Sequence, residues 1–182
     1  DRGRTYMLGQ ERPSVGIFKN VMISDIIASG ADTTGCSITG LPDKKIENVK
    51  LDNIQITFKG GGKAYTIGKT VPELREHYPE STKFGALQAY GFYLRHISGL
   101  SMTNINLSYQ NEDQRCAVIA EKVDDLDIVN LRALSGTVNK YLMKFNNIRN
   151  AYISGCRAKN QSDFFINVSG AESDKIILNN NF

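Results

Sequence analysis

The chain has 182 residues, 41% of them hydrophobic, and its 22 basic and 19 acidic residues leave a formal net charge of +3. This length fits one domain or one array of repeats, and a charge this small gives no basic stripe for binding nucleic acid. Because no apolar run approaches the roughly 20 residues of a membrane helix, no membrane span is expected.

A spaced pattern of apolar and Asn-like residues returns five times along the chain. In each copy apolar residues recur at short intervals, and Asn, Asp or Gly occupies the third and the eighth position. Self-similarity at a fixed period of this size is the signature of a solenoid. The copies start at Phe18, Ile46, Ile97, Val123 and Ile148.

Each period also contains a second apolar stretch that precedes the next copy or follows the last one. Pairs of apolar residues at i and i+2 dominate these stretches, which favours short strands over helices. One turn of the solenoid therefore contains at least two strands. The second stretches lie at 36–38, 92–94, 117–120, 141–145 and 164–168.

Strands this short cannot bury their inner face alone. Stacking each strand on its equivalent in the next turn, about 4.8 Å away, pairs the backbones in a parallel ladder and builds columns of Ile, Val and Leu inside. Asn and Gly tolerate the left-handed backbone of a sharp corner, and stacked Asn amides can hydrogen-bond along the stack. The sequence predicts an all-β, right-handed parallel β-helix of about six to seven turns, forming one domain over residues 1–182.

The rival solenoid is the leucine-rich repeat, whose period overlaps this one. A leucine-rich repeat would have Asn at the ninth position of each copy. In this chain the ninth position is apolar in all five copies. The pattern therefore disfavours a leucine-rich repeat. The five apolar residues are Ile26, Ile54, Ile105, Leu131 and Cys156.

The two ends of such an array need covering, because each end presents unpaired strand edges. Residues 1–16 precede the first copy and begin with the basic residues Arg2 and Arg4. We expect residues 1–16 to form a cap or arm over one end, or the chain to self-associate through its open ends.

The interval between the second and third copies is about twice the others. It starts with the flexible glycines 60–62 and is predicted to be an inserted loop, a long excursion from the array over about residues 60–90. A helical turn is expected at 71–76, since Pro72 suits a first turn and Glu73 its positive end. Pro79 would end that turn.

Several stretches around this excursion resemble glycoside hydrolase family 28, the pectin-degrading polygalacturonases and rhamnogalacturonan hydrolases, most closely the bacterial gut type. They are Gly35-Cys36-Ser37-Ile38-Thr39-Gly40-Leu41-Pro42, the copy at 46–54, Val71-Pro72-Glu73, Tyr78-Pro79-Glu80, Phe84-Gly85 and Tyr90-Gly91-Phe92-Tyr93-Leu94-Arg95-His96. The likeness runs over about residues 12 to 135 and covers the C-terminal part of that family's domain.

The resemblance implies a pectin-lyase-like β-helix, an acidic plant-type polysaccharide as partner, and a periplasmic or extracellular location. It also implies contact with an N-terminal half through an open end. That family hydrolyses with inversion and carries its catalytic groups on N-T-D, D-D, G-H-G and R-I-K motifs, of which the first two contain the carboxylates. This chain has no N-T-D, G-H-G or R-I-K motif, and its acid pair Asp124-Asp125 falls at a repeat corner without the family's surrounding motif, so no catalytic residue is assigned. The alternatives are a non-catalytic polysaccharide-binding solenoid and a purely structural one.

Basic and aromatic side chains near the excursion are the candidate substrate-binding residues. Arg and Tyr suit a uronate-bearing saccharide through a bidentate carboxylate bond and ring contact, and we expect them to face outward beside the excursion. The candidates are Arg75, His77, Tyr78, Tyr93, Arg95 and His96.

The three cysteines favour no metal site. They lack the C-x-x-C spacing of a structural zinc site, and an odd number cannot pair fully. Cys156 occupies an apolar position of the repeat and is expected to be a buried small hydrophobic residue. No metal and no cofactor are predicted.

Overall fold

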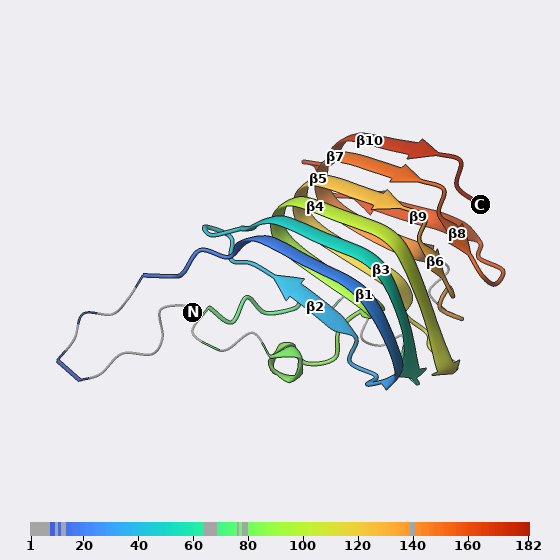
Figure 1. Ribbon diagram of the computed structural model, residues 1–182, viewed down its shortest axis with the longest axis horizontal. Helices are drawn as coiled ribbons and strands as arrows, with labels where there is room; N and C mark the ends of the chain where they lie inside the picture. The colour runs from blue at the N-terminus through green and yellow to red at the C-terminus, as the bar shows by residue number, and fades with distance from the viewer. Residues whose placement is uncertain are drawn as a thin grey trace.

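The computed structural model describes residues 8–9, 11, 14–63, 69–75, 77, 80–138 and 141–182. They form a right-handed parallel β-helix of about six turns, which confirms the predicted architecture. The coils stack in chain order from β1 (Lys19–Ala31) at one end to β10 (Asp174–Asn179) at the other (Figure 1). The strands between are β2 (Cys36–Thr39), β3 (Ile46–Gly60), β4 (Ala89–Asn111), β5 (Cys116–Val129), β6 (Arg132–Ala133), β7 (Tyr141–Ser154), β8 (Arg157–Ala158) and β9 (Phe164–Ser169).

The register places equivalent residues of the copies directly on one another. Val21 pairs with Val49, Val49 with Leu100, and Leu100 with Leu126. The middle members of this inner column are at most 2% exposed. Each fully buried aliphatic side chain contributes about 1.5–3 kcal/mol relative to an exposed one, so these columns hold the coils together.

Both predicted corners have the left-handed backbone that Asn, Asp and Gly favour. Asn48 and Asn53 of β3 have φ of 51° and 52°, and Gly99 takes the first of these corners in β4 with φ 77°. The corner amides bond along the stack: Asn48 donates to Asn20 at 2.8 Å, and Asn53 to Asp25 at 2.7 Å. The predicted amide ladder is therefore confirmed.

A third corner ends the second stretch of the turns at 92–95, 117–121 and 141–146. It has the same left-handed backbone at His96, Lys122 and Asn147, each with φ of 53°. Left-handed His or Lys is uncommon, so residue type alone does not predict this corner.

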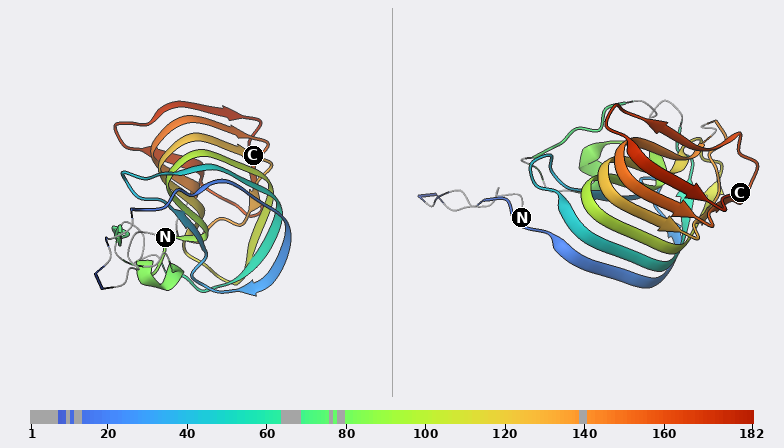
Figure 2. Two further views of the ribbon diagram at one scale, coloured as in Figure 1. Left: turned by 60° about the vertical axis from the view of Figure 1, so that its left-hand side comes forward. Right: turned by 90° about the horizontal axis from the view of Figure 1, so that it is seen from above.

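The excursion lies outside the coil, as Figure 2 shows for the 3-10 helix η2 (Ser81–Phe84). It covers the outer face of the sheet formed by the first segments of β4 and β5. Outward residues of that sheet and residues of the excursion share a second apolar cluster, separate from the core. Its buried members are Val71, Phe84, Leu87, Ala89, Tyr93, Cys116 and Ile119.

The prediction of a helical turn at 71–76 is wrong. Residues 71–74 are not helical, and Leu74 has φ of 46°, which a right-handed helix cannot accommodate. The carbonyls of Val71 and Pro72 accept hydrogen bonds from Arg95 instead of closing a helical turn. Glu76 and Pro79 lie outside the described residues.

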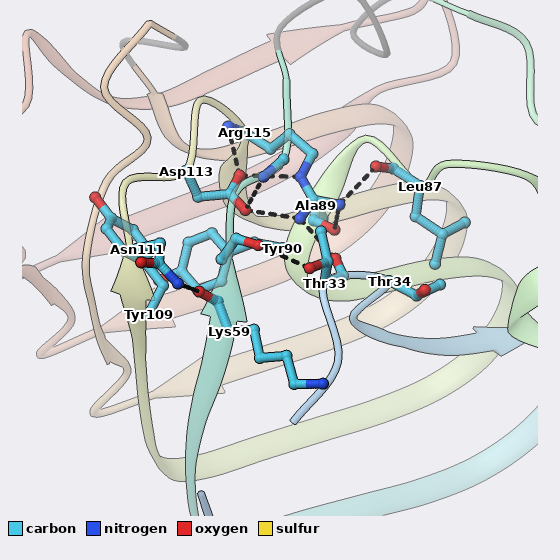
Figure 3. Close-up of polar contacts among 12 residues, drawn as sticks. Thr33, Thr34, Lys59, Leu87, Ala89, Tyr90, Tyr109, Asn111, Asp113 and Arg115 are labelled. Atoms are coloured by element: carbon cyan, nitrogen blue, oxygen red, sulfur yellow. Dashed lines mark hydrogen bonds and ion pairs between the residues drawn. The ribbon is translucent and has the colours of Figure 1, made fainter. Parts of the chain in front are cut away.

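A buried ion pair fastens both ends of the excursion (Figure 3). Arg115 donates to the Asp113 carboxylate at 2.7 Å, with side chains 2% and 0% exposed. Asp113 also accepts from the Gly62 amide at 2.9 Å, where the excursion leaves β3, and Arg115 donates to the Leu87 carbonyl at 3.1 Å, where it returns. Gly62 is closely packed at this point, because a Cβ on it would lie 1.9 Å from Arg115 Nε, whereas a Cβ on Gly61 would meet nothing within 4 Å, so a flexible exit at glycines 60–62 stays a prediction.

The first coil leaves its inner face open. A hollow of ≈ 470 Å³ with a mainly apolar lining lies against β1, β2 and residues 15–18, and Ile23 of β1 is 39% exposed. At the other end Leu178 of β10 is 49% exposed. Much of the predicted 1–16 cap lies outside the described residues; of those described, Leu8 is exposed and Val15 lines the hollow. Self-association stays a prediction.

None of the helices in the described ranges is long and apolar enough to cross a membrane.

Candidate functional site

Three predicted binding residues, Tyr93, Arg95 and His96, lie where the first segment of β4 meets its corner. Tyr93 and Arg95 alternate with the core residues Phe92 and Leu94, so their side chains leave the core as predicted. The excursion then covers them, leaving Tyr93 0%, Arg95 4% and His96 2% exposed. The accessible Tyr–Arg platform expected from the sequence is therefore absent, because alternation shows which side chains point outward but not what packs over them.

Arg95 attaches the excursion to the sheet. Its guanidinium donates to the carbonyl of Val71 at 2.6 Å and to that of Pro72 at 2.9 Å. It also lies 3.5 Å from the Glu73 carboxylate and 5.6 Å from the centroid of the Tyr93 ring. These contacts use most of the guanidinium donors on the protein itself, and only Nε is buried without a partner. Arg95 is thus a structural residue in this fold.

His96 and Glu73 form a polar pair at the same corner. The ring nitrogen Nε2 lies 3.0 and 3.1 Å from the two carboxylate oxygens of Glu73, which is 39% exposed. Burial lowers the pKa of His96, and the Glu73 carboxylate opposes that shift. The Tyr93 hydroxyl donates a hydrogen bond to the Glu121 carboxylate at 2.6 Å. Burial is the main cause that raises the pKa of the Tyr93 phenol, and the Glu121 carboxylate is the second. The corner is a closed polar network under the excursion.

Arg75 and His77 are the exposed members of the predicted set. Arg75 forms a bidentate pair with Asp43, with an Nη2–Oδ2 distance of 2.9 Å, and joins the excursion to the loop after β2. This contact lowers the pKa of Asp43. The His77 amide donates to the Leu74 carbonyl in a turn, and its side chain is exposed. Tyr78 lies outside the described residues. Sugar binding by Arg75 and His77 remains a prediction.

A polar hollow of ≈ 520 Å³ lies beside this contact, between the loop after β2 and the first corner of β3 and β4. Arg75 reaches its edge through Asp43. Hydroxyl, amide, ammonium and carboxylate groups all line it, which suits a ligand rich in hydroxyl groups. The lining residues are Pro42, Asp43, Lys45, Glu47, Asn48 and Ser98.

Ion pairs across the coils border the hollow. Asp124 pairs with Lys45 and, at 2.7 Å, with Arg149. The Arg149 contact is the main cause that lowers the pKa of Asp124. Asp125 accepts from Asn150 at 2.6 Å in the corner ladder. The acid pair Asp124-Asp125 therefore has the structural role expected from its place in the repeat.

The cysteines and acidic residues of the described ranges offer no metal cluster of three or more ligands. Cys116 and Cys156 are buried, the latter in the core as predicted. Burial raises the pKa of the Cys116 thiol to about 12, so it stays protonated near neutral pH.

The sequence analysis missed an outward-facing column of mostly polar and charged side chains on another side of the solenoid, exposed at Gln55, Arg132 and Arg157 and half-buried at Asn106. The backbone register stacks Asn106 on Gln55, Arg132 on Asn106 and Arg157 on Arg132. Phe182 follows, since its amide donates to the Cys156 carbonyl and its carbonyl accepts from the Ala158 amide. We call these five residues the outer column.

The signal for this column is present in the repeat. Its first four residues occupy the tenth position of their copies, whereas the sequence analysis compared only the apolar positions and the third and eighth positions. Aligning the copies at the tenth position would have shown two arginines on consecutive turns.

A scan against protein-family models matches none of them. Searches of curated proteins and of solved structures find no significant match either.

Proposed function

We propose that this chain is a glycoside-hydrolase-like β-helix module of the family 28 type, which binds an acidic plant polysaccharide of the polygalacturonan or rhamnogalacturonan class. The ligand lies on the outside of the solenoid, in the polar hollow beside the excursion. A periplasmic or extracellular location belongs to the same proposal. The observation that carries it is the convergence of distant segments around that hollow.

Two of the stretches that carry the family resemblance, 35–42 and 46–54, contribute Pro42, Glu47 and Asn48 to its lining. Gly40 donates its amide to the carbonyl of Arg95, and Arg95 in turn holds the carbonyls of Val71 and Pro72. These contacts join 35–42, 71–73 and 90–96, which lie far apart in the sequence. The segments that carry the resemblance therefore contact one another in the fold, and the excursion reaches the hollow through the Arg75–Asp43 pair.

The chemistry of the hollow fits a uronate-bearing sugar. Asn48 and Ser98 offer an amide and a hydroxyl to sugar hydroxyls, and the ammonium of Lys45, which pairs with Asp124, can also contact a ligand carboxylate. Arg75 holds Asp43 at the surface, where exposed ion pairs contribute little stability, so a ligand carboxylate can replace Asp43 in the guanidinium fork.

The proposal gives this chain no catalytic step. Inverting hydrolysis needs an acid and a base placed on opposite sides of the glycosidic bond, and this sequence has neither the N-T-D motif of family 28 nor that family's motif around its acid pair. Any hydrolysis would depend on carboxylates from further coils, stacked against the open face of β1 in a longer protein or an assembly.

The test combines binding with turnover. We expect the protein to be stabilised thermally by oligogalacturonate and to release no reducing ends from it. The double variant Lys45→Gln/Arg75→Gln should weaken binding about tenfold, since each lost charge-assisted contact removes part of the affinity. The double variant Lys19→Gln/Lys50→Gln removes two charges outside the residues lining the hollow and is the control. Equal affinity in all three proteins, or no binding at all, would refute the proposal.

A further inference from the structure

The outer column places two guanidinium groups on neighbouring coils. Arg132 and Arg157 pair in register in parallel strands, about 4.8 Å apart along the stack. Both side chains are exposed and alternate with inward-facing neighbours such as Leu131 and Cys156, so both point away from the core.

A third cation lies beside them. Lys159 follows Arg157 by two residues, and its ammonium donates to the Asn106 amide oxygen and to the Leu107 carbonyl at 3.4 Å. Burial lowers the pKa of Lys159, and Arg132 and Arg157 lower it further. The hydrogen bonds to Asn106 and Leu107, which pair in register with Arg132 and Ala133, place the lysine beside the arginines.

None of these three cations has a carboxylate partner within the described ranges of the chain. Like charges that face one another on neighbouring strands destabilise a sheet. Lys45 and Arg149 share Asp124, and Arg75 has Asp43, whereas exposed lysines such as Lys50 and Lys59 also have no carboxylate partner in the described ranges. What distinguishes Arg132 and Arg157 is that the register places their like charges on neighbouring coils.

The rest of the column suits a sugar polymer. Gln55 stacks before the arginines with an exposed side-chain amide, next to Asn106, whose amide oxygen accepts from Lys159. Phe182 stacks after the arginines and is 80% exposed. Four coil spacings separate Gln55 from Phe182, about 19 Å along the stack. An aromatic ring packs on the apolar face of a sugar, and guanidinium groups bind carboxylates in a bidentate manner.

We propose that the outer column, with Lys159 beside it, is a second polysaccharide-binding face, where a carboxylate-bearing glycan runs along the stack. Its carboxylates lie between Arg132 and Arg157, and one sugar ring packs on Phe182. The proposal shares the ligand class with the proposed function but uses other residues on another face.

Binding is measured by calorimetry with oligogalacturonate and with its methyl-esterified, uncharged form. Arg132→Gln/Arg157→Gln should lose about tenfold or more in affinity for the acidic form, because two charge-assisted contacts disappear. Lys50→Gln/Lys59→Gln loses the same charge elsewhere and should bind within about twofold of wild type, since exposed charges at a distance are screened by salt. Phe182→Ala should weaken binding of both forms.

Thermal unfolding separates binding from structure. If the arginines bind a ligand, Arg132→Gln/Arg157→Gln should unfold at the same temperature as wild type or higher, because mutual repulsion is removed. A lower midpoint, or affinity equal to that of the Lys50/Lys59 control, would overturn the proposal. If only Lys45→Gln/Arg75→Gln loses binding, the outer column is not a binding face, and the proposed function at the polar hollow still holds. If only Arg132→Gln/Arg157→Gln loses binding, the ligand does not bind in the polar hollow.

Discussion

Replacing Arg115 with Met tests whether one buried ion pair holds the excursion onto the solenoid. The guanidinium binds Asp113 and also donates to the carbonyls of Leu87, Ala89 and Thr33, the last at 2.7 Å. Met is an adaptable apolar side chain that can fill much of the space but supplies none of these donors. The Asp113 carboxylate would keep only its two backbone donors, from Gly62 and Arg115.

The expected loss is large because Asp113 is 0% exposed. Removing one partner of a buried ion pair costs about 3–5 kcal/mol, whereas a whole domain is stable by about 5–15 kcal/mol. We therefore expect Arg115→Met to lower the free energy of unfolding by about 4 kcal/mol. The excursion should also become more sensitive to limited proteolysis near Gly62 and Leu87, the two points that the pair fastens.

Urea unfolding followed by circular dichroism measures the change, and two further variants interpret it. Arg149→Met removes an exposed partner of Asp124, with a side chain 54% exposed, and should cost no more than about 1 kcal/mol. Adding Asp113→Leu to Arg115→Met removes the stranded charge and should recover part of the loss, a coupling typical of residues in one network. If Arg115→Met and Arg149→Met cost the same, the pair does not hold the excursion.

Three further changes probe other parts of the fold. Gly62→Ala should lower the thermal midpoint, since its Cβ would lie 1.9 Å from Arg115 Nε and must displace the buried pair; an unchanged midpoint contradicts the packing described. Glu73→Gln should lower the pKa of His96 further in an NMR titration, because it removes the carboxylate that opposes the effect of burial. As the pKa of His96 lies below its unfolded value, stability should fall as pH drops through about 6.5, and more so in Glu73→Gln. Light scattering of the wild-type chain should give a mass above 20.2 kDa that falls in Ile23→Asp, which charges the open end; a wild-type monomer would count against self-association.

The solenoid could be predicted because its stabilising interactions recur in the sequence. Val21, Val49 and Leu100 share an inner column, so each copy repeats the same requirement for an aliphatic side chain. Asn48 and Asn53 repeat the requirement for a left-handed corner with an amide that bonds along the stack. Each requirement recurs with the period, which is why a single sequence suffices to reveal it.

The excursion could not be predicted in the same way, because its contacts occur once. The sequence around Pro72 and Glu73 has local preferences for a helical turn, but Arg95 binds the carbonyls of Val71 and Pro72 from another strand. A tertiary contact thus overrides the local preference. The same contact buries Arg95 and removes it from the surface where alternation had placed it.

The outer column illustrates a more general separation in this fold. An inner position must be apolar in every coil, so its residue type indicates the fold but gives little information about function. An outer position such as that of Gln55, Asn106, Arg132 and Arg157 meets no such requirement, and its neighbours along the stack are set by the register alone. Two arginines on consecutive coils repel one another, and neither has a carboxylate partner in the part of the chain that the structure describes. Their placement is therefore best explained by an anion that binds between them, and the affinity of Arg132→Gln/Arg157→Gln for an acidic glycan decides the matter.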